Sequence, residues 1–283
     1  MNPGAPRWSA MPSIAPSKPT TTTRVARVPY LNSVPFFQGL VLGEAFELTD
    51  GFPRELGQQA AAGQITAGLV PVADYFRLQD RFERVGPFGI AVRGRAHSVL
   101  LFARRPIRQL DGASIALTAE SSSSVALLRL LLGERYGLTP RYVEGPHPAR
   151  PGSGDSRAGD ADAVLLIGDE ALRVQQSNTQ YPFETDIAFE WWLWQHLPFV
   201  FAVWVIRKDA ASGAKKELEQ GLSRCLGLNT KNLPSVAAEC ALKAGMTPEQ
   251  VYAYLANFIY RLSRPEEEGI VRFQELLGES GLL

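Results

Sequence analysis

Ser114-Ile-Ala-Leu-Thr-Ala-Glu-Ser-Ser-Ser-Ser-Val125 is the stretch that decides the fold, because an apolar strand ends there in hydroxyl residues just before a helix. We expect the strand over Ser114–Thr118 and the helix over Val125–Tyr136. A second unit of this kind follows at Ala163-Val-Leu-Leu-Ile167, which leads through Gly168-Asp169 into another helix. Alternating strands and helices predict parallel α/β layers.

Further elements lie on both sides of these two units. Towards the N-terminus we expect a strand over 24–28, a helix over 54–63, a strand over 67–70 and extended runs over 88–92 and 98–103. Towards the C-terminus, an apolar and aromatic stretch over 189–206 contains at least one strand, and helical patterning follows over about 213–226, 233–244, 248–262 and 266–279. The chain is therefore predicted to be α/β throughout.

The arrangement of these elements predicts two lobes with a ligand cleft between them. The middle block, 107–197, carries its own set of strands and helices, and the runs Ser98–Ala103 and Pro198–Ile206 flank it as crossing strands. We therefore assign 24–106 with 198–283 to lobe 1 and 107–197 to lobe 2. Residues 1–23 are interpreted as a disordered tail and 144–160 as a surface loop. Open α/β sheets bind ligands where strand ends and helix N-termini converge.

Charge and composition exclude several classes of partner. The 29 basic residues are balanced by 29 acidic ones, and no basic stripe is present. Nucleic acids and anionic membranes both need clustered positive charge, so neither is an expected partner. No apolar run reaches the roughly 20 residues of a membrane-spanning helix. Residues 1–23 lack the apolar region of a secretory signal, so we expect a cytoplasmic protein.

Cys225 and Cys240 lie fifteen positions apart, and the three histidines lie elsewhere in the chain. This spacing matches no common zinc pattern, so no metal site is predicted. The sequence also lacks the glycine-rich nucleotide motifs and the Gly-x-Ser-x-Gly motif of serine hydrolases.

Four polar loops are candidates for ligand contact. In the first, Asn32 and Ser33 offer an amide and a hydroxyl, although both residue types also favour turns and helix caps. In the second, Thr118 and Ser121–Ser124 precede a helix, where hydroxyls, free N–H groups and the helix dipole suit a carboxylate or phosphate. One serine suffices as a cap, so the run exceeds a purely structural requirement.

The other two loops contain Gly168-Asp169 and His97-Ser98. Asp169 follows a fully apolar strand, so it is placed at the cleft mouth as an acceptor for substrate hydroxyls or as a base. Capping of the following helix explains Asp169 equally well. The residues alone thus indicate a two-lobed α/β protein with a neutral polar cleft for a small anion.

Several segments, taken together and in order, resemble the MqnA-type menaquinone biosynthesis family. The resemblance runs from about residue 24 to the end of the chain. It is carried by Val28–Phe36, Gly68–Tyr75, Ile90–Gly94, Ser98–Phe102, Ile115–Thr118, Ser121–Leu128, Leu166–Leu172, Leu197–Trp204 and Glu268–Phe273. The chain departs from the family at Gln195-His196, where Thr-Gly is common, and at Ser121–Ser124, where the family has Ser-x-Thr-Ser. The hydroxyls survive this second change.

This resemblance implies a type II periplasmic-binding-protein-like fold and a cofactor-free chorismate dehydratase of the futalosine pathway. The product would be 3-[(1-carboxyvinyl)oxy]benzoate, and no metal is implied. Asn32 and Asp169 are the implied catalytic residues: Asn32 holds the reacting groups, and Asp169 orients or protonates the leaving hydroxyl. The substrate's enolpyruvyl carboxylate is expected to take the proton. The implied substrate-binding residues are Ser33, Ser98, Thr118, Ser121, Ser122, Ser123 and Gly168.

Two alternatives remain at this point. A non-catalytic cytoplasmic binding protein or sensor for small anions would have the same fold, because fold does not determine function. A later enzyme of the same pathway resembles this family distantly and would be expected to use a catalytic histidine. His97, His147 and His196 all lie outside the four polar loops or at their edge.

Overall fold

The computed structural model describes residues 22–144 and 161–283 of the 283-residue chain. Most of the predicted tail (1–23) and of the predicted surface loop (144–160) lies outside these residues. Thr23 already belongs to the first strand, β1 (Thr23–Arg27), and is 7% exposed. The ordered chain therefore includes a residue that the sequence had assigned to the tail, because Thr23 pairs with Phe46.

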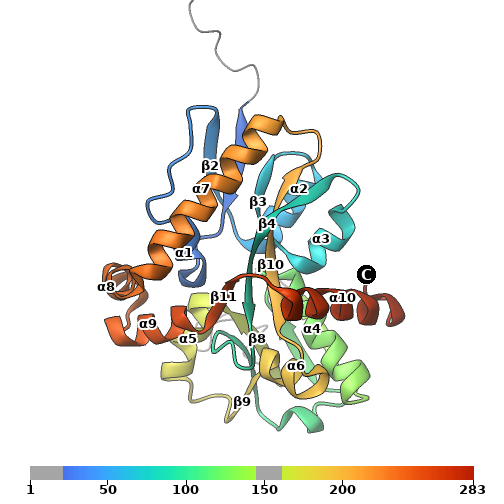
Figure 1. Cartoon of the computed structure of the whole chain (residues 1–283). Coiled ribbons are helices and arrows are strands. Elements are labelled where there is room, and N and C mark those ends of the chain that lie inside the picture. Colours follow the sequence, from blue (N-terminus) through green and yellow to red (C-terminus); the bar gives the residue numbers. More distant parts are fainter. Residues whose placement is uncertain (1–21, 145–160) are drawn as a thin grey trace, which may run out of the picture.

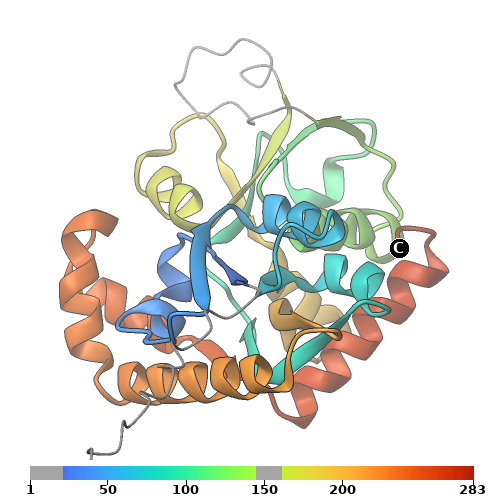
Figure 2. The ribbon, with the colours of Figure 1, turned by 90° about the horizontal axis from the view of Figure 1, so that it is seen from above.

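The first sheet has six strands in the order β11-β4-β10-β3-β1-β2. β1 is parallel to β2 (Phe46–Asp50) and β3 (Ala67–Pro71), and the antiparallel strands are β4 (Phe82–Val92), β10 (Phe199–Arg207) and β11 (Phe258–Arg261). The accompanying helices are α1 (Val34–Phe37), α2 (Pro53–Ala61), α3 (Val72–Leu78), α7 (Ser212–Lys231), α8 (Leu233–Ala244), α9 (Pro248–Ala256) and α10 (Arg264–Glu279). Helices α7 and α10, orange and red in Figure 2, lie at the outside of the molecule.

The second sheet has five strands in the order β7-β6-β8-β5-β9 and occupies the lower part of Figure 1. Its strands are β5 (Val99–Ala103), β6 (Ser114–Leu117), β7 (Arg141–Glu144), β8 (Ala163–Ile167) and β9 (Phe183–Asp186). Its helices are α4 (Ser122–Leu130), which continues as a π-helical turn over Leu131–Arg135, α5 (Gly168–Ser177) and α6 (Ile187–Gln195), with a short 3₁₀ turn over Ile107–Gln109. The prediction of a mixed α/β protein is confirmed.

The chain passes between the sheets at two places, and one of them differs from the prediction. The sequence had grouped the strand at 98–103 with lobe 1. In the structure β5 pairs antiparallel with β8 and β9, so it belongs to the second sheet. The crossing therefore lies between Val92 and Val99, and β10 forms the return between β3 and β4.

The predicted helix over 248–262 is wrong in its second half. α9 ends at Ala256, and Phe258–Arg261 form β11 along the edge of β4, with Ile259 opposite Ala91. Strands β2, β7 and β9 were also not predicted. Each of the three lies at the edge of a sheet and is only four or five residues long, which gives a periodic pattern little length in which to show.

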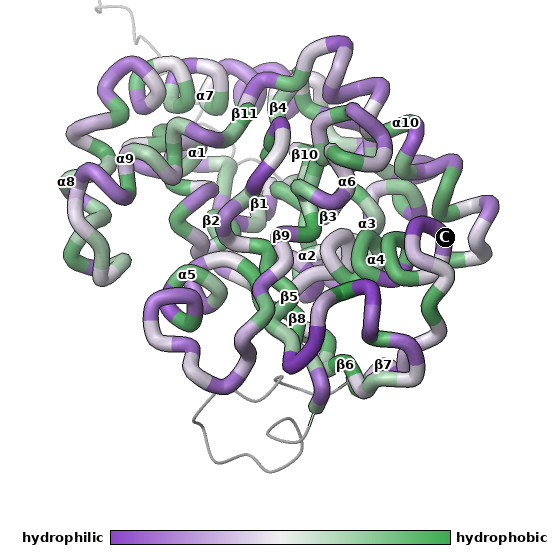
Figure 3. Tube along the Cα trace, turned by 90° about the horizontal axis from the view of Figure 1, so that it is seen from below, coloured by the Kyte–Doolittle hydropathy of each residue, from purple (hydrophilic) through white to green (hydrophobic). Residues whose placement is uncertain are grey.

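The hydrophobic core is continuous across both sheets. In Figure 3 the mainly hydrophobic segments gather along the inner strands, and hydrophilic segments lie on the outer loops. Trp191 of α6 and Phe273 of α10 meet edge to face, with ring centroids 5.7 Å apart, and Phe199 of β10 lies 5.0 Å from Phe273. These aromatic contacts connect α10 to α6, beside the second sheet, and to β10 of the first sheet.

Candidate active site

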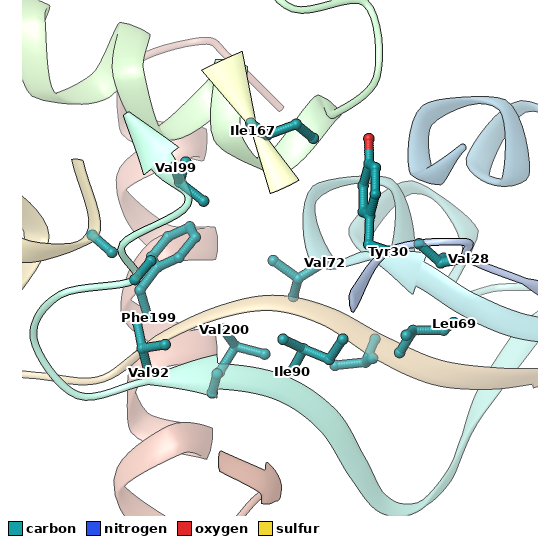
Figure 4. Packing of buried hydrophobic residues seen from close by; sticks show 14 of the residues in the cluster. Val28, Tyr30, Leu69, Val72, Ile90, Val92, Val99, Ile167, Phe199 and Val200 are labelled. Carbon is teal, nitrogen blue, oxygen red and sulfur yellow. The ribbon is translucent and has the colours of Figure 1, made fainter. Parts of the chain in front are cut away.

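The ends of several strands from both sheets face one another around a single cavity. β1 and β3 end there from the first sheet, and β6 and β8 end there from the second. Because β5 is antiparallel to β8, with Val99 opposite Ile167, its first residues reach the same edge. Figure 4 shows Val28, Leu69 and Ile90 on one side and Val99 and Ile167 on the other. The cavity, of about 50 Å³, is lined by Val28, Tyr30, Asn32, Pro53, Leu69, Pro71, Ile90, Ser98, Val99, Ser121, Ser124, Ile167, Gly168, Phe201, Ala202 and Phe258.

Asn32 presents an unsatisfied acceptor to this cavity. It lies in a 3₁₀ turn, Leu31–Ser33, which follows β1. The Ser33 hydroxyl closes the turn through contacts with the carbonyl oxygens of Val28 (2.6 Å) and Tyr30 (2.7 Å). Among the described residues, the buried Oδ1 of Asn32 has no hydrogen-bond partner. Such an atom costs about 1–3 kcal/mol in an otherwise folded protein, so a ligand donor is its natural partner.

Ser98 is held so that its proton is available to a ligand. The buried hydroxyl of Tyr254, on α9, donates to Ser98 Oγ at 2.8 Å. The Gly168 N–H donates to the Ser98 carbonyl at 2.7 Å, which extends the pairing of β5 with β8 and fixes the backbone at Ser98. Since Oγ already accepts from Tyr254, the Ser98 hydroxyl can serve as a donor to an anionic group in the cavity.

The serine run before α4 divides into two faces. Ser121 caps the helix by accepting from the Ser124 N–H at 3.1 Å, and the two hydroxyls lie 3.0 Å apart. Both serines line the cavity. Ser122 and Ser123, by contrast, point toward α3 on the first sheet, because successive helical residues are turned by about 100°.

The partners of these two serines are specific. The Ser122 hydroxyl donates to Asp74 Oδ2 at 2.5 Å, and Ser123 Oγ accepts from the Ala73 N–H at 3.1 Å. Thr118 is also turned away from the cavity, where its Oγ1 accepts from the Glu120 N–H at 3.1 Å. The Thr118 hydroxyl thus stabilises the loop itself, and the hydroxyls of Ser122 and Ser123 connect the loop to α3.

Tyr30 and Glu120 connect the two sheets at the cavity. The Tyr30 hydroxyl, which points away from Val28 and Leu69 in Figure 4, donates to Glu120 Oε2 in a short hydrogen bond. Burial and the neighbouring carboxylate raise the pKa of Tyr30, so its phenol stays protonated. The ring lies against Gly168, where a Cβ would stand 3.1 Å from two ring carbons, and the positive φ of 59° there also favours glycine.

Asp169 lies behind the Asn32 turn. Its Oδ1 accepts from the Leu31 N–H at 3.1 Å, which connects α5 to the first sheet. Burial raises the pKa of this carboxyl, and the Leu31 N–H opposes that shift. Asp169 is not among the cavity-lining residues, although it adjoins Gly168, which is.

The structure thus brings four of the nine predicted site residues to one cavity: Asn32, Ser98, Ser121 and Gly168. The other five, Ser33, Thr118, Ser122, Ser123 and Asp169, lie around it and bond to neighbouring segments. Sequence reasoning missed Tyr30, Ser124 and Tyr254. The first two lie inside the predicted loops, where strand-end position was the available signal, but nothing in the sequence connects Tyr254 with Ser98.

Within residues 22–144 and 161–283, no group of three or more His, Cys, Asp or Glu side chains is arranged to hold a metal ion, and both cysteines are free. In the same part of the chain, no helix has the length and apolar character needed to cross a membrane.

Residues 23–279 match the model of a protein family described as menaquinone biosynthesis. The chain belongs to this family. The chain is 35% identical over 263 residues to a chorismate dehydratase of Thermus thermophilus. These residues cover 88% of this chain and 93% of that protein. The resemblance inferred from the ordered segments is confirmed.

Two solved structures are similar in fold to this chain. It superposes on protein AF1704 from Archaeoglobus fulgidus with a TM-score of 0.75 at 18% identity, covering 93% of this chain and 98% of that one. The periplasmic aliphatic sulphonate binding protein SsuA from Escherichia coli gives a TM-score of 0.61 at 15% identity, covering 93% and 88%. These likenesses confirm the predicted periplasmic-binding-protein-like fold.

Proposed function

We propose that this protein is a chorismate dehydratase, a hydro-lyase that removes water from chorismate to give 3-[(1-carboxyvinyl)oxy]benzoate. The observation that carries the proposal is the 35% identity to a chorismate dehydratase over nearly the whole of both chains. The cavity supports it chemically, since chorismate has two carboxylates and a hydroxyl, and the cavity offers serine hydroxyls and an unsatisfied amide oxygen.

Binding in this cavity would use donors from the second sheet. The Ser98 hydroxyl, which accepts from Tyr254, donates to one carboxylate. Ser121 and Ser124, at the N-terminus of α4, suit a second anionic group, because the helix dipole favours negative charge there. Asn32 Oδ1, which has no partner in the described chain, accepts from the ring hydroxyl of the substrate.

The elimination needs one proton removed from ring C3 and one hydroxide lost from C4. We assign the base to the enolpyruvyl carboxylate of the substrate: it takes the C3 proton, the C–H electrons form the new ring double bond, and the C4–O bond breaks. Asp169, the neighbour of the cavity-lining Gly168, gives its carboxyl proton to the departing hydroxide, which leaves as water, and the substrate carboxylic acid then returns a proton to Asp169. The products are one water and an aromatic ring, whose formation drives the reaction, so the protein mainly has to orient these groups.

The finer parts of the proposal rest on the family resemblance. They are the futalosine pathway as the route served by the reaction and the cytoplasm as its location. The roles of Ser33, Thr118, Ser122 and Ser123 are proposed to be indirect, through the loops that their hydrogen bonds shape.

The test is to incubate purified protein with chorismate, without any added cofactor, and to follow products by chromatography and mass spectrometry. We expect a protein-dependent product lighter by one water, which the Asn32→Ala and Ser121→Ala variants fail to form. Arg264→Gln, at a side chain 90% exposed on α10, is the matched control and should retain full activity. Tight chorismate binding without turnover would overturn the proposal in favour of a small-anion sensor.

The same assay ranks the two catalytic residues. Asp169→Asn keeps an oxygen that can accept from the Leu31 N–H, but it removes the acid. We expect Asn32→Asp to lose more activity than Asp169→Asn. The opposite order would contradict the substrate-assisted mechanism and make Asp169 the principal acid–base group.

A further inference from the structure

A second pocket, of about 310 Å³, lies outside the candidate active site between α2, α3 and α4. In Figure 1, α3 lies between α2 and α4, and it packs against both. The pocket is lined by Arg54, Gln58, Ala73, Asp74, Arg77, Ser122, Val125, Ala126, Arg129 and Leu282. Its volume falls at the lower end of the range for small-molecule sites, about 300–1,000 Å³.

The charged groups of this pocket come from both sheets and are mainly cationic. Arg54 is on α2 and Arg77 on α3, beside the first sheet, whereas Arg129 is on α4, beside the second. Asp74 is the one acidic residue among the lining side chains of the described chain. Guanidinium groups from both sheets thus line the pocket, and their planar sets of N–H donors match the oxygens of an anionic ligand.

Existing contacts fix the walls of the pocket, and Arg77 also donates to the Leu282 carbonyl at 3.2 Å. Asp74 is held by the Ser122 hydroxyl at 2.5 Å and lies 3.7 Å from Arg77. It packs so closely on α2 that a Cβ at Gly57 would stand 2.1 Å from Oδ2. Arg129 stacks on the ring of Tyr142, with its guanidinium carbon 4.8 Å from the centroid. The site is therefore preorganised from the second sheet as well as the first.

Arg54 supplies the observation that points to a ligand. Its side chain is only partly exposed and lines the pocket. Within residues 22–144 and 161–283 its guanidinium makes no hydrogen bond or ion pair, although its backbone N–H donates to the Glu120 carbonyl at 3.0 Å. A half-buried guanidinium presents up to five donors in a planar fork, which matches the oxygens of a phosphate or carboxylate.

We propose that this pocket binds a small dianion, either a phosphate or a dicarboxylate, between Arg54, Arg77 and Arg129. The bound anion would connect α2 and α3 of the first sheet to α4 of the second. Because Ser122 belongs to the same serine run as Ser121, the ligand would also contact the loop that lines the substrate cavity from its other side.

The test is the thermal shift of the full-length protein in inorganic phosphate and, separately, in malonate, each against sodium chloride at matched ionic strength. We expect one of the two dianions to raise the Tm, since a ligand that binds the folded state stabilises it. The anion that gives the larger shift identifies the source of the oxyanion groups. Arg54→Gln and Arg129→Lys should weaken the apparent Kd by about tenfold or more, the value of one charge-assisted contact. Arg264→Gln should leave it unchanged.

A further variant distinguishes this pocket from the substrate cavity. Ser98→Ala removes a donor from the cavity and leaves the arginine pocket intact, so the anion shift should persist in it. The proposal is overturned if the shift disappears in Ser98→Ala but survives in Arg54→Gln, or if chloride gives the same shift as the dianions. These outcomes do not depend on turnover of chorismate, so they are independent of the proposed activity.

Discussion

Gly168 is the residue where backbone geometry and side-chain packing meet at the cavity. Its φ of 59° lies in the left-handed region, and the Tyr30 ring occupies the space that a Cβ would take. Its N–H is committed to the Ser98 carbonyl, so any displacement is transmitted to the Ser98 side chain. A glycine is therefore required here by two independent constraints.

We expect Gly168→Ala to lower the free energy of unfolding by about 2 kcal/mol or more, from the strain of the left-handed backbone and from crowding against Tyr30. Gly137→Ala is the matched control, because φ is 64° there and nothing lies within 4 Å of the added Cβ. It should show the smaller, purely conformational loss in urea denaturation. Equal losses at the two positions would contradict the proposed contact with Tyr30.

Asp169 carries a prediction about pH, because burial raises the pKa of its carboxyl above the ordinary value of 3.8. Because its pKa is higher in the folded state, the Asp169 carboxyl binds its proton more tightly there than in the unfolded state. Its contribution to the free energy of unfolding is therefore full at pH values below 3.8 and is lost as pH rises through the raised pKa. Asp169→Asn removes this term. In denaturant titrations, the free energy of unfolding of the variant, relative to that of the wild type, should therefore be higher at pH 7 than at pH 4.

Asp162 provides the control of opposite sign. Hydrogen bonds from the Ser114 N–H and hydroxyl lower the pKa of the Asp162 carboxyl. Its contribution to stability is present above the unfolded value and is lost as pH falls through the folded pKa. Asp162→Asn should thus be more harmful at pH 7 than at low pH. The same pH trend in both variants would contradict the assignment.

Among the individual residues of the site, those next to the ends of apolar strands could be predicted from the sequence. Asn32, Ser98, Ser121 and Gly168 each follow or precede an apolar run, and each lines the cavity. Ser122 and Ser123 were predicted with Ser121, but the phase of α4 turns them toward α3. That phase depends on where the helix begins, which a run of four serines does not specify.

At the scale of elements, Asp186 joins the first passage of the chain between the sheets to the start of α6. One carboxylate oxygen accepts from the N–H groups of Ala96 and His97, each at 2.8 Å. The other accepts from those of Ala188 and Phe189, each at 3.1 Å, at the start of α6. The first pair immediately precedes Ser98, so Asp186 holds one cavity-lining residue in place through the backbone.

We expect Asp186→Asn to cost about 1–3 kcal/mol of stability, because an amide offers one acceptor oxygen and turns its NH₂ toward two N–H donors. Displacement of Ser98 should also raise KM for chorismate more than it lowers kcat. Denaturant unfolding and steady-state kinetics measure the two effects. As a control, Asp111→Asn, at an exposed residue that accepts from the Thr139 N–H, should leave KM unchanged.

The elements that sequence patterns failed to predict are those made by pairing at sheet edges. The segment from Pro248 to Leu262 reads as one helix, yet Phe258–Arg261 turn into β11 because β4 offers an unpaired edge. Tertiary pairing thus overrides local preference. The grouping of β5 failed for a similar reason, since an apolar strand between two sheets pairs with whichever partner lies beside it.

At the scale of the whole molecule, the two sheets are closed upon each other. Hydrogen bonds cross between them from Tyr30 to Glu120 and from the Leu31 N–H to Asp169. A third joins Tyr254, on α9, to Ser98. The cavity enclosed in this arrangement is about 50 Å³, well below the roughly 300 Å³ at which small-molecule sites begin. We therefore expect chorismate to enter through an opening of the sheets that breaks the crossing hydrogen bonds.

The Tyr30–Glu120 hydrogen bond is the contact whose loss should shift this equilibrium with least harm to the core. Tyr30→Phe keeps the ring against Gly168 and removes only the hydroxyl, so the closed form should lose about 1 kcal/mol relative to the open form. We expect KM for chorismate to rise by about fivefold with kcat little changed. Small-angle scattering should show a larger radius of gyration without substrate and convergence with the wild type at saturation. A fall in kcat at constant KM would instead place the Tyr30 hydroxyl at the reacting atoms. A hydrogen bond that only stabilises the closed form changes KM, whereas a catalytic group changes the activation free energy of the reaction.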